Sequence, residues 1–418
     1  MVLDSAVTAA PDLDRELPVL LLRTDPNPFH HGTLGAIRSL GRLGVSVHAG
    51  LGGRAEPCTA SRYLCRQHPV EPKDERDLLL RLNIIARRIG RRALLVPLDD
   101  AGAVFAAEHS AALAKEFVLS PPTPWTPRSV ADKSELHRRC RALGIPTAES
   151  HFPDIPEEAD AVLGRLGFPC VAKWARPWLL PSGQRSTMLV TGRAQAHRLL
   201  AGTAGPAGPL ILQRYIAPGA GDWFFHGYFD DGGRCLFGGA GRKHVSYPAH
   251  TGHTVAGEWV CNPELEAHAH AVAARLGIRG VVDMDFRRDG ENGDYALLDC
   301  NPRLGAQFRL FSDRGGLDLA RVVHLAASGR AVPEPRPAYG RTIVVEQQYL
   351  QSSLRSPDAL AHVRRFRDAH EFAWYAPDDL APFVALGRRA ASKAIGRAVR
   401  SSSALAQRAR AAKTSGGN

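Results

Sequence analysis

Residues 281–303 constrain the fold of this chain more than any other stretch. Both ends of the stretch are rich in β-branched and apolar residues, and the polar run 289–294 between them contains glycine and asparagine, which are typical of turns. Two strand-forming segments joined by a short polar turn predict an antiparallel hairpin.

Four polar side chains lie at matching positions on the two predicted strands. Because alternate residues of a strand face one side, a hairpin folded symmetrically about Asn292 places Asp285 opposite Asp299, and Asp283 opposite Asn301. Facing carboxylates lie about 5 Å apart and repel by roughly 3 kcal/mol at an effective dielectric near 20. A bound cation reverses that cost, and Mg²⁺ prefers carboxylate, amide and phosphate oxygens. The hairpin therefore predicts a metal–nucleotide site, although solvated acids on an exposed hairpin would fit the pattern too.

The order Asp285, then Asp299-x-Asn301-Pro-Arg303, resembles the metal-binding signature of the ATP-grasp superfamily. In that family an acidic residue and a following Glu-x-Asn hold the Mg²⁺ ions that bridge the ATP phosphates. Asp299 stands where glutamate is usual, which shortens the side chain by one methylene. The resemblance implies ATP as the nucleotide, Mg²⁺ (or Mn²⁺) as the metal, and Asp285, Asp299 and Asn301 as its ligands. Asp283 is expected to lie outside the ligand set.

The N-terminal part predicts a parallel α/β unit. A strand over residues 17–22, a loop over 23–32, a helix over 34–40 and a strand over 45–48 follow in order, and a further helix and strand occupy 74–100. Strands alternating with helices favour a Rossmann-like parallel sheet. The unit has no GxGxxG motif and therefore no dinucleotide fingerprint.

Two pairs of polar residues follow these strands. His30 and His31 lie in the loop after the first strand, where open α/β sheets bind ligands, but we expect a solvent-exposed pair. Asp99 and Asp100 end the later strand, and we expect them to cap the next helix rather than to bind substrate.

A proline-rich segment, residues 120–126, predicts a domain boundary near Pro124. We expect one continuous helix after it, with Thr126 as N-cap and Pro127 at the first helical position. Lys133 on this helix would ordinarily be a solvated surface residue. In the ATP-grasp pattern, a lysine here reaches the nucleotide phosphates.

Lys173 ends a short apolar strand that begins at Gly167. Lysine suits phosphate binding as a point charge, and in ATP-grasp enzymes the lysine of such a strand contacts the α/β-phosphates. The loop over residues 174–187 that follows could wrap phosphates through backbone N–H groups.

The strand over residues 209–216 corresponds, by resemblance, to the hinge of the two ATP-grasp lobes. Its backbone would hydrogen-bond the adenine, and an acid after the hinge would accept from the ribose hydroxyls. The cofactor-binding residues implied here are Gln213, Arg214, Tyr215, Ile216 and Asp222.

Two arginines are the catalytic candidates. Arg242 and its neighbour Lys243 follow the strand predicted at 235–238, between glycine-rich turns, where cations are commonly solvated. From its place between hinge and hairpin, the resemblance implies that Arg242 holds the γ-phosphate or the developing acyl phosphate. Arg303 would meet the transferred phosphate or the substrate carboxylate.

The fold class that follows is α/β and α+β, with a Rossmann-like parallel-sheet domain followed by a two-lobed ATP-grasp fold. The predicted division of the chain is a flexible N-terminus over 1–16, an N-terminal domain over 17–124, an ATP-grasp domain over 125–330, a C-terminal region over 331–385 and a basic tail over 386–418.

The resemblance extends over residues 19–329 and favours the carboxylate–amine ligase branch, which includes D-aspartate ligase-like proteins. It implies an ATP-dependent ligase that activates a small-molecule carboxylate as an acyl phosphate and joins it to the amine of an amino acid or peptide-like substrate. An ATP-grasp carboxylase, a carboxylate–thiol ligase and a catalytically silent nucleotide-binding scaffold are the alternatives.

The net charge of +11 invites a nucleic-acid interpretation, but eight basic residues lie after Leu386 in a tail without acids. The rest of the chain is nearly balanced and lacks nucleic-acid recognition motifs, so we expect no nucleic-acid partner. The tail is expected to be a solvated or frayed helix, and weak attraction to an anionic surface is the alternative.

Cysteine usage and the apolar pattern bear on the compartment. The seven cysteines include no CxxC pair, and no apolar run reaches the roughly 18 residues of a membrane span. The N-terminus carries acids and lacks the apolar core of a secretion signal. We therefore expect a reduced, cytoplasmic protein.

Overall fold

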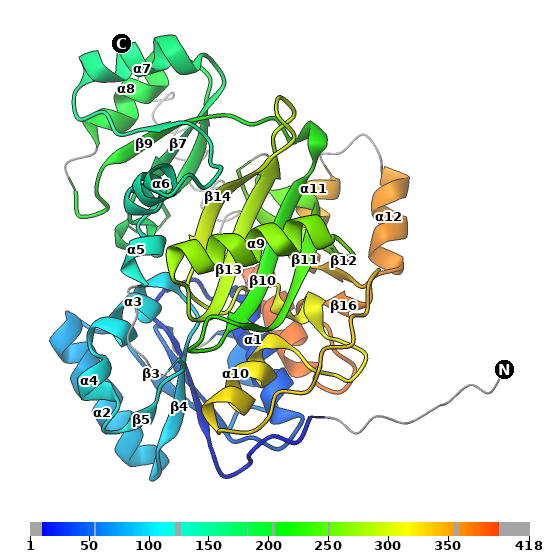
Figure 1. Ribbon diagram of the computed structural model, residues 1–418. Coiled ribbons are helices and arrows are strands. Elements are labelled where there is room, and N and C mark those ends of the chain that lie inside the picture. Colours follow the sequence, from blue (N-terminus) through cyan, green and yellow to red (C-terminus); the bar gives the residue numbers. More distant parts are fainter. Residues whose placement is uncertain are drawn as a thin grey trace, which may run out of the picture.

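The computed structural model describes residues 11–53, 56–121, 127–181, 183–202, 205–249, 251–354 and 359–392. The boundary predicted near Pro124, the Thr126 cap and the end of the basic tail lie outside these ranges. Within them, the chain forms three sheets with helices packed around them (Figure 1). No helix of the described part is long and apolar enough to cross a membrane.

The first sheet confirms the predicted parallel α/β unit. Its order is β3-β2-β1-β4-β5, and all described pairings are parallel. The strand β1 lies in the centre and is fully buried because its sequence is almost entirely apolar. The elements are β1 (Val19–Arg23), α1 (His31–Gly41), β2 (Val47–Leu51), η1 (Pro57–Ala60), β3 (Arg66–Pro69), α2 (Glu75–Ile89), β4 (Ala93–Pro97), α3 (Asp100–Glu108), α4 (Ser110–Leu113) and β5 (Phe117–Val118).

Capping residues set the helix starts in this unit. Asp99 is the N-cap of α3, as predicted, and its carboxylate accepts from the Gly102 backbone N–H at 2.8 Å. The same carboxylate accepts from the backbone N–H groups of Thr24 and Asp25, both at 2.6 Å. These bonds join the loop after β1 to the loop after β4 at the carboxyl edge of the sheet.

The second sheet is small and antiparallel. Its order is β6-β9-β7-β8, and the helices α7 and α8 pack together against it, over a core that includes Cys170 and Leu212. Figure 1 places this lobe at the far end from the parallel sheet. The elements are β6 (Ser150–His151), α7 (Pro156–Leu166), β7 (Cys170–Trp174), η2 (Pro177–Leu179), β8 (Thr187–Val190), α8 (Arg193–Ala201), β9 (Leu210–Arg214) and η3 (Pro218–Ala220).

The third sheet has seven strands in the order β14-β13-β10-β11-β12-β15-β16. The helix α9 covers one face (Figure 1), and α10 contacts strands β10, β11 and β13. The elements are β10 (Asp222–Phe229), β11 (Cys235–Tyr247), β12 (His253–Val260), α9 (Pro263–Leu276), β13 (Gly280–Arg288), β14 (Tyr295–Asn301), η4 (Phe308–Phe311), α10 (Leu319–Ala327), β15 (Thr342–Val344), α11 (Glu346–Ser353), α12 (Ala359–Arg367) and β16 (Glu371–Phe372).

The helix predicted after the proline-rich segment is two helices, so that prediction is wrong. Pro127 is the N-cap of α5 (Arg128–Ala131), and the chain then breaks at Asp132, whose φ of −69° and ψ of 109° are extended. The Asp132 carboxylate accepts from two backbone N–H groups of the next turn, because aspartate favours a cap over a helix interior. Lys133 thereby becomes the first residue of α6 (Lys133–Ala142).

A buried ion pair ties the C-terminal residues to the parallel unit. Arg38 on α1 donates to the Asp379 carboxylate at 2.9 Å and to the Trp374 carbonyl at 2.9 Å. Ser61 also donates to the Asp379 carboxylate, at 2.7 Å. Both charged side chains are almost fully buried, so this contact holds segments that are far apart in the sequence.

Candidate active site

The predicted hairpin is present with the predicted register. Strands β13 and β14 pair antiparallel, with Asp285 opposite Asp299 and Asp283 opposite Asn301. The register shifts directly after Asp285, which leaves Leu298 as the extra residue of a β-bulge. The two carboxylates of the candidate metal site therefore lie across a strand pair, as the alternation of the sequence required.

Two lysines from other elements reach this hairpin. Lys133, at the start of α6, forms an ion pair with Asp299, and Lys173 on β7 donates to the Leu298 carbonyl of the bulge at 2.9 Å. Both lysines are 5% exposed. The α6 start, β7 and the hairpin thus converge on one buried cluster, and both predicted lysines belong to it.

Burial and charge act against each other in this cluster. Burial lowers the pKa of Lys173 to about 8, although Asp299 raises it in part. Burial alone would raise the pKa of Asp299, but Lys133 and Lys173 bring it below its ordinary value. Asp299 therefore stays ionised although it is mostly buried, and an ionised carboxylate is the form that binds a cation.

Arg242 does not lie in this cluster, and Lys243 takes the place that we expected for it. Strand β11 continues to Tyr247, so the two cations are neighbours in a strand and face opposite sides. Lys243 pairs with Asp285 at 2.5 Å. The exposed Arg242 lies on the other face, with its guanidinium 5.6 Å from the centre of the Trp223 ring.

Both carboxylate oxygens of Asp283 have partners. His226 on β10 lies 3.0 Å from one of its carboxylate oxygens, and Arg303 donates to the other at 2.7 Å. Burial alone would raise the pKa of Asp283, but His226 and Arg303 bring it well below its ordinary value. Arg303 also approaches Asp100 of the parallel unit at 3.4 Å. Asp100 therefore does more than begin a helix: it helps to place the predicted catalytic arginine.

Asn301 ends β14 beside this group and is buried. Its side-chain amide donates to the Asp283 carbonyl at 3.4 Å. Because the amide nitrogen is used by that bond, the amide oxygen is the atom that Asn301 can offer to a cation.

The hinge residues reach the cluster through an arginine that the sequence interpretation missed. Arg287 donates to the Ile216 carbonyl at 2.7 Å, pairs with Asp222, and has its guanidinium 5.7 Å from the centre of the Tyr215 ring. It lies two residues after Asp285 and therefore on the same strand face. That alternation was the signal that could have found it.

The other two hinge residues have partners of their own. Gln213 is buried and donates to the Ser150 hydroxyl at 2.9 Å. Arg214 forms an ion pair with Asp289 in the hairpin turn. Both residues nevertheless line the cavity described next.

A cavity of about 90 Å³ separates the small sheet from the large one. Its walls include Lys173, Lys243, Asp285 and Asp299, together with three hinge residues, Gln213, Arg214 and Ile216. Typical ligand pockets measure roughly 300–1,000 Å³. A nucleotide would therefore enter this space only with the two sheets further apart.

A second cavity, of about 220 Å³, lies on the other side of Lys243 and Asp285, which line both spaces. His30 and His31 line this second cavity, where His31 is buried and His30 is partly buried. The expectation of a solvent-exposed pair is therefore wrong, because the loop after β1 packs against the large sheet. Burial lowers the pKa of both histidines well below the ordinary value, so both are neutral near pH 7.

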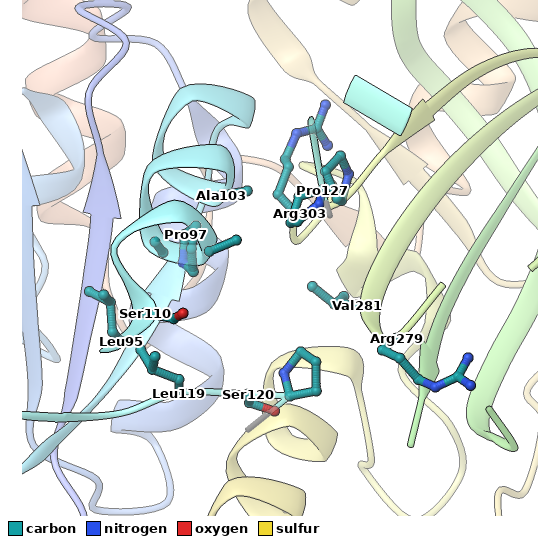
Figure 2. Close-up of a pocket in the computed structure, with 14 residues that line it drawn as sticks. Leu95, Pro97, Ala103, Ser110, Leu119, Ser120, Pro127, Arg279, Val281 and Arg303 are labelled. Atoms are coloured by element: carbon teal, nitrogen blue, oxygen red, sulfur yellow. The ribbon is translucent and has the colours of Figure 1, made fainter. Parts of the chain in front are cut away.

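Arg303 also lines two further spaces. A third cavity, of about 640 Å³, opens between the loops after β1 and β4 and the segment after β7, which includes Trp178. A mainly apolar fourth cavity, of about 80 Å³, lies between α3 and the start of β13, with Arg303 and Pro127 at one end and Ser120 at the other (Figure 2). Neither has Asp285 or Asp299 in its wall, so the chemistry centres on the first two.

The donor set fits Mg²⁺ that is shared with phosphates. Among the described residues, no group of three or more His, Cys, Asp or Glu side chains is placed to hold a metal ion. Mg²⁺ bound with a nucleotide usually takes only one or two carboxylates from the protein. Two facing aspartates, the Asn301 amide oxygen and nearby lysines match that requirement.

Comparisons with known proteins bear on the fold. No protein-family model matches the chain. The chain is similar to the C-terminal section of the carbamoyl phosphate synthase large chain of Methanopyrus kandleri, with 26% identity over 214 residues, which cover 49% of this chain and 38% of the relative. The match thus spans well under half of that relative's length.

Solved structures extend the likeness over most of the chain. The L-amino acid ligase from Bacillus licheniformis superposes with a TM-score of 0.58 at 15% identity, covering 79% of each chain. The biotin carboxylase domain dimer of 2-oxoglutarate carboxylase from Hydrogenobacter thermophilus, in complex with MgADP, ADP and bicarbonate, gives a TM-score of 0.55 at 16% identity, covering 77% of this chain and 73% of that one. At such identities the likeness is one of fold.

Proposed function

We propose that this chain, which belongs to the ATP-grasp superfamily, is an ATP-dependent ligase that activates a carboxylate as an acyl phosphate and joins it to an amine. The observation that carries the proposal is the buried cluster at the hairpin. Asp285 and Asp299 face each other across two strands, and lysines from three other elements converge on them. This arrangement suits a magnesium-bound polyphosphate better than any uncharged ligand.

A free carboxylate lacks a good leaving group, and this determines the chemistry. Attack by an amine on a free carboxylate would expel oxide, whereas an acyl phosphate has phosphate as a good leaving group. Transfer of the γ-phosphoryl group needs little covalent help from a protein and depends on positioning and charge neutralisation. When bound, Mg²⁺ would supply part of that neutralisation.

The residues of the chain then take separate tasks. Asp285, Asp299 and the Asn301 amide oxygen would hold the metal, and Lys133 and Lys173 would bind phosphate oxygens. The backbone of Arg214, Tyr215 and Ile216 would accept the adenine beside Gln213, and Asp222 the ribose. Lys243 stands between the first and second cavities, and we assign it the γ-phosphate in place of Arg242. Arg303 would orient the substrate carboxylate in the second cavity.

The nearest alternative is carboxylation. The Hydrogenobacter thermophilus structure contains bicarbonate with MgADP. Bicarbonate, like a carboxylate, would be activated by transfer of the γ-phosphoryl group of ATP to one of its oxygens. The likeness to an L-amino acid ligase, at a similar TM-score and coverage, supports an amino acid or peptide-like substrate.

All seven cysteines are free thiols in the structure, which supports the cytoplasm as the site of action.

A phosphate-release screen tests this proposal. The full chain is incubated with MgATP and a pool of amino acids and small carboxylates, with and without bicarbonate. Carboxylate-dependent release of ADP and phosphate is expected, and release of AMP and pyrophosphate would contradict the proposal. ATP cleavage that requires bicarbonate alone would favour the carboxylase.

A variant of Lys173 shows whether the activity belongs to this site. Lys173→Met keeps the length of the side chain and removes the buried cation that contacts the bulge, so we expect loss of turnover by at least about 100-fold. Lys115→Met removes a lysine of the parallel unit as a matched control and is expected to be neutral. Unchanged activity of Lys173→Met would remove Lys173 from the site.

A further inference from the structure

The second cavity contains a buried imidazole nitrogen that the nucleotide chemistry does not use. His226 on β10 is 1% exposed, and its Nδ1 atom has no hydrogen-bond partner among the described residues. A buried polar atom without a partner destabilises the folded chain, so such an atom calls for a functional explanation. Lys243, Asp285, Asn301 and Arg303 line the same cavity, which places His226 beside the reacting centre.

The orientation and tautomer of the ring are set by its neighbours. The Nε2 atom lies 3.0 Å from Oδ1 of Asp283, and Arg303 holds Oδ2 of the same carboxylate. An ionised carboxylate only accepts hydrogen bonds, so Nε2 is the nitrogen that donates to Asp283, and Nδ1 is the nitrogen left to accept a proton. The rings of Phe224 and Phe311, whose centres lie 5.3 Å and 5.2 Å away, pack around the imidazole.

Two other histidines of the cavity use a ring nitrogen in a contact of their own. His30 uses its Nδ1 atom to accept from the Thr33 backbone N–H and so caps α1. His253 contacts the Gln348 side chain through Nε2 at 3.0 Å. His31 also has a buried Nδ1 atom without a partner among the described residues. It therefore offers a comparison within the same cavity.

We propose that His226, oriented by Asp283, is the catalytic proton acceptor for the amine substrate, and that the nucleophile therefore arrives as an ammonium in the second cavity. This inference rests on the acyl-phosphate function proposed above. An ammonium has no lone pair and cannot attack until it loses a proton, so a ligase for amines needs an acceptor at this point.

The step balances as follows. The ammonium gives one proton to Nδ1 of His226, and the freed lone pair of the nitrogen forms a bond to the acyl carbon. The bond from that carbon to the phosphate oxygen breaks, and the phosphate leaves with the electron pair. The second proton of the nitrogen goes to the departing phosphate, so that amide, hydrogen phosphate and one proton on His226 result.

The charged groups around the ring fit a transient acceptor. Asp283 stabilises the imidazolium, whereas Arg303 and Lys243 in the same cavity oppose a lasting positive charge. Asp285 and the three neutral histidines His30, His31 and His253 complete the set of titratable groups in the wall. The ring can thus take the proton during the reaction and release it afterwards.

Hydroxylamine separates this role from acyl-phosphate formation. It is largely unprotonated at neutral pH, so it attacks an acyl phosphate without a proton acceptor and yields a hydroxamate. The wild type and His226→Asn are given MgATP and the pool of proteinogenic amino acids, which supplies carboxylate and amine, with or without hydroxylamine. We expect His226→Asn to lose amide formation by about 100-fold or more, with hydroxamate formation within about threefold of the wild type.

Matched variants control for structural effects. His270→Asn changes a histidine of α9 that packs against the Phe225 ring and should leave both rates unchanged. His31→Asn should lower amide formation much less than His226→Asn does. MgATP affinity verifies that each variant is folded, and His226→Gln replaces His226→Asn if that variant fails.

The outcomes separate the two proposals. Absence of hydroxamate with the wild type contradicts the acyl-phosphate function itself. Hydroxamate from the wild type, with equal losses of hydroxamate and amide in the His226 variant, overturns the role of His226 alone. A larger loss of amide in His31→Asn than in His226→Asn would also overturn it.

Discussion

Replacing Lys243 and Arg242 separately by methionine tests which neighbour belongs to the nucleotide site. The Lys243 side chain is 13% exposed and its partner Asp285 is 30% exposed, so the variant removes a largely buried charge. Hydrogen bonds to charged groups contribute about 1.5–3 kcal/mol. Because Asp285 keeps some solvent, we expect a loss of about 2 kcal/mol, which is roughly 30-fold in affinity.

Calorimetric titration with Mg²⁺ and a non-hydrolysable ATP analogue measures this loss directly. Arg242→Met is the matched control, because Arg242 is exposed on the opposite face of the same strand, and it should bind within about twofold of the wild type. Urea unfolding of both variants shows whether the fold is intact. Weaker binding by Arg242→Met than by Lys243→Met would refute the assignment of the two faces.

Three further predictions concern the metal, the C-terminal anchor and acid stability. Asp299→Asn should weaken binding of MgATP by about tenfold or more and binding of metal-free ATP far less; equal losses in calorimetry would count against a metal role. Asp379→Ala should lower the free energy of unfolding in urea by about 3–5 kcal/mol, because it leaves the buried Arg38 without its carboxylate. Asp378→Ala, which removes a partly exposed ion pair, should lower it by under about 1 kcal/mol. Similar losses for the two variants would contradict this prediction. Burial, assisted by His48, lowers the pKa of His68 from 6.5 to about 4. Between these values the unfolded chain binds a proton that the folded chain does not, so stability falls on acidification from pH 6.5 to 4, by up to about 3 kcal/mol. A steeper acid loss in His68→Asn than in the wild type would contradict this.

The hairpin could be predicted because its signal is local. Strand alternation and a symmetric turn fix which side chains face each other, and the structure has Asp285 opposite Asp299 as expected. Lys173 ends a strand that the sequence marks clearly, whereas Lys133 is assigned from the resemblance alone, because the break at Asp132 that makes it the first residue of α6 is not predicted. Their meeting point at the Leu298 bulge could not be predicted, because a bulge depends on the pairing of two strands.

The resemblance points to Arg242, and the sequence does not show that β11 continues through it to Tyr247 and turns Lys243 to the face of Asp285. The glycines of β11 resemble turn residues, but in the structure they make room for aromatic rings. A Cβ atom on Gly241 would lie 2.3 Å from the Phe224 ring, and one on Gly239 would lie 2.6 Å from the Trp259 indole nitrogen. Packing against rings that are distant in the sequence, and not a turn, explains these glycines.

The position of His30 and His31 in a cavity wall could not be predicted from the sequence either. Both lie in a loop, and loops usually lie on the surface. Here the loop after β1 faces the large sheet, so its side chains form the wall of a cavity. That contact joins residues about 200 positions apart, which no local pattern encodes.

Oxygen-18 transfer tests the central claim most directly. The substrate carboxylate found in the screen is labelled with oxygen-18 and incubated with MgATP, the amine and the full chain, and the released phosphate is analysed by mass spectrometry. An acyl phosphate intermediate predicts ADP and inorganic phosphate that carries one labelled oxygen from the carboxylate. Unlabelled phosphate, or label in AMP with release of pyrophosphate, would contradict the account.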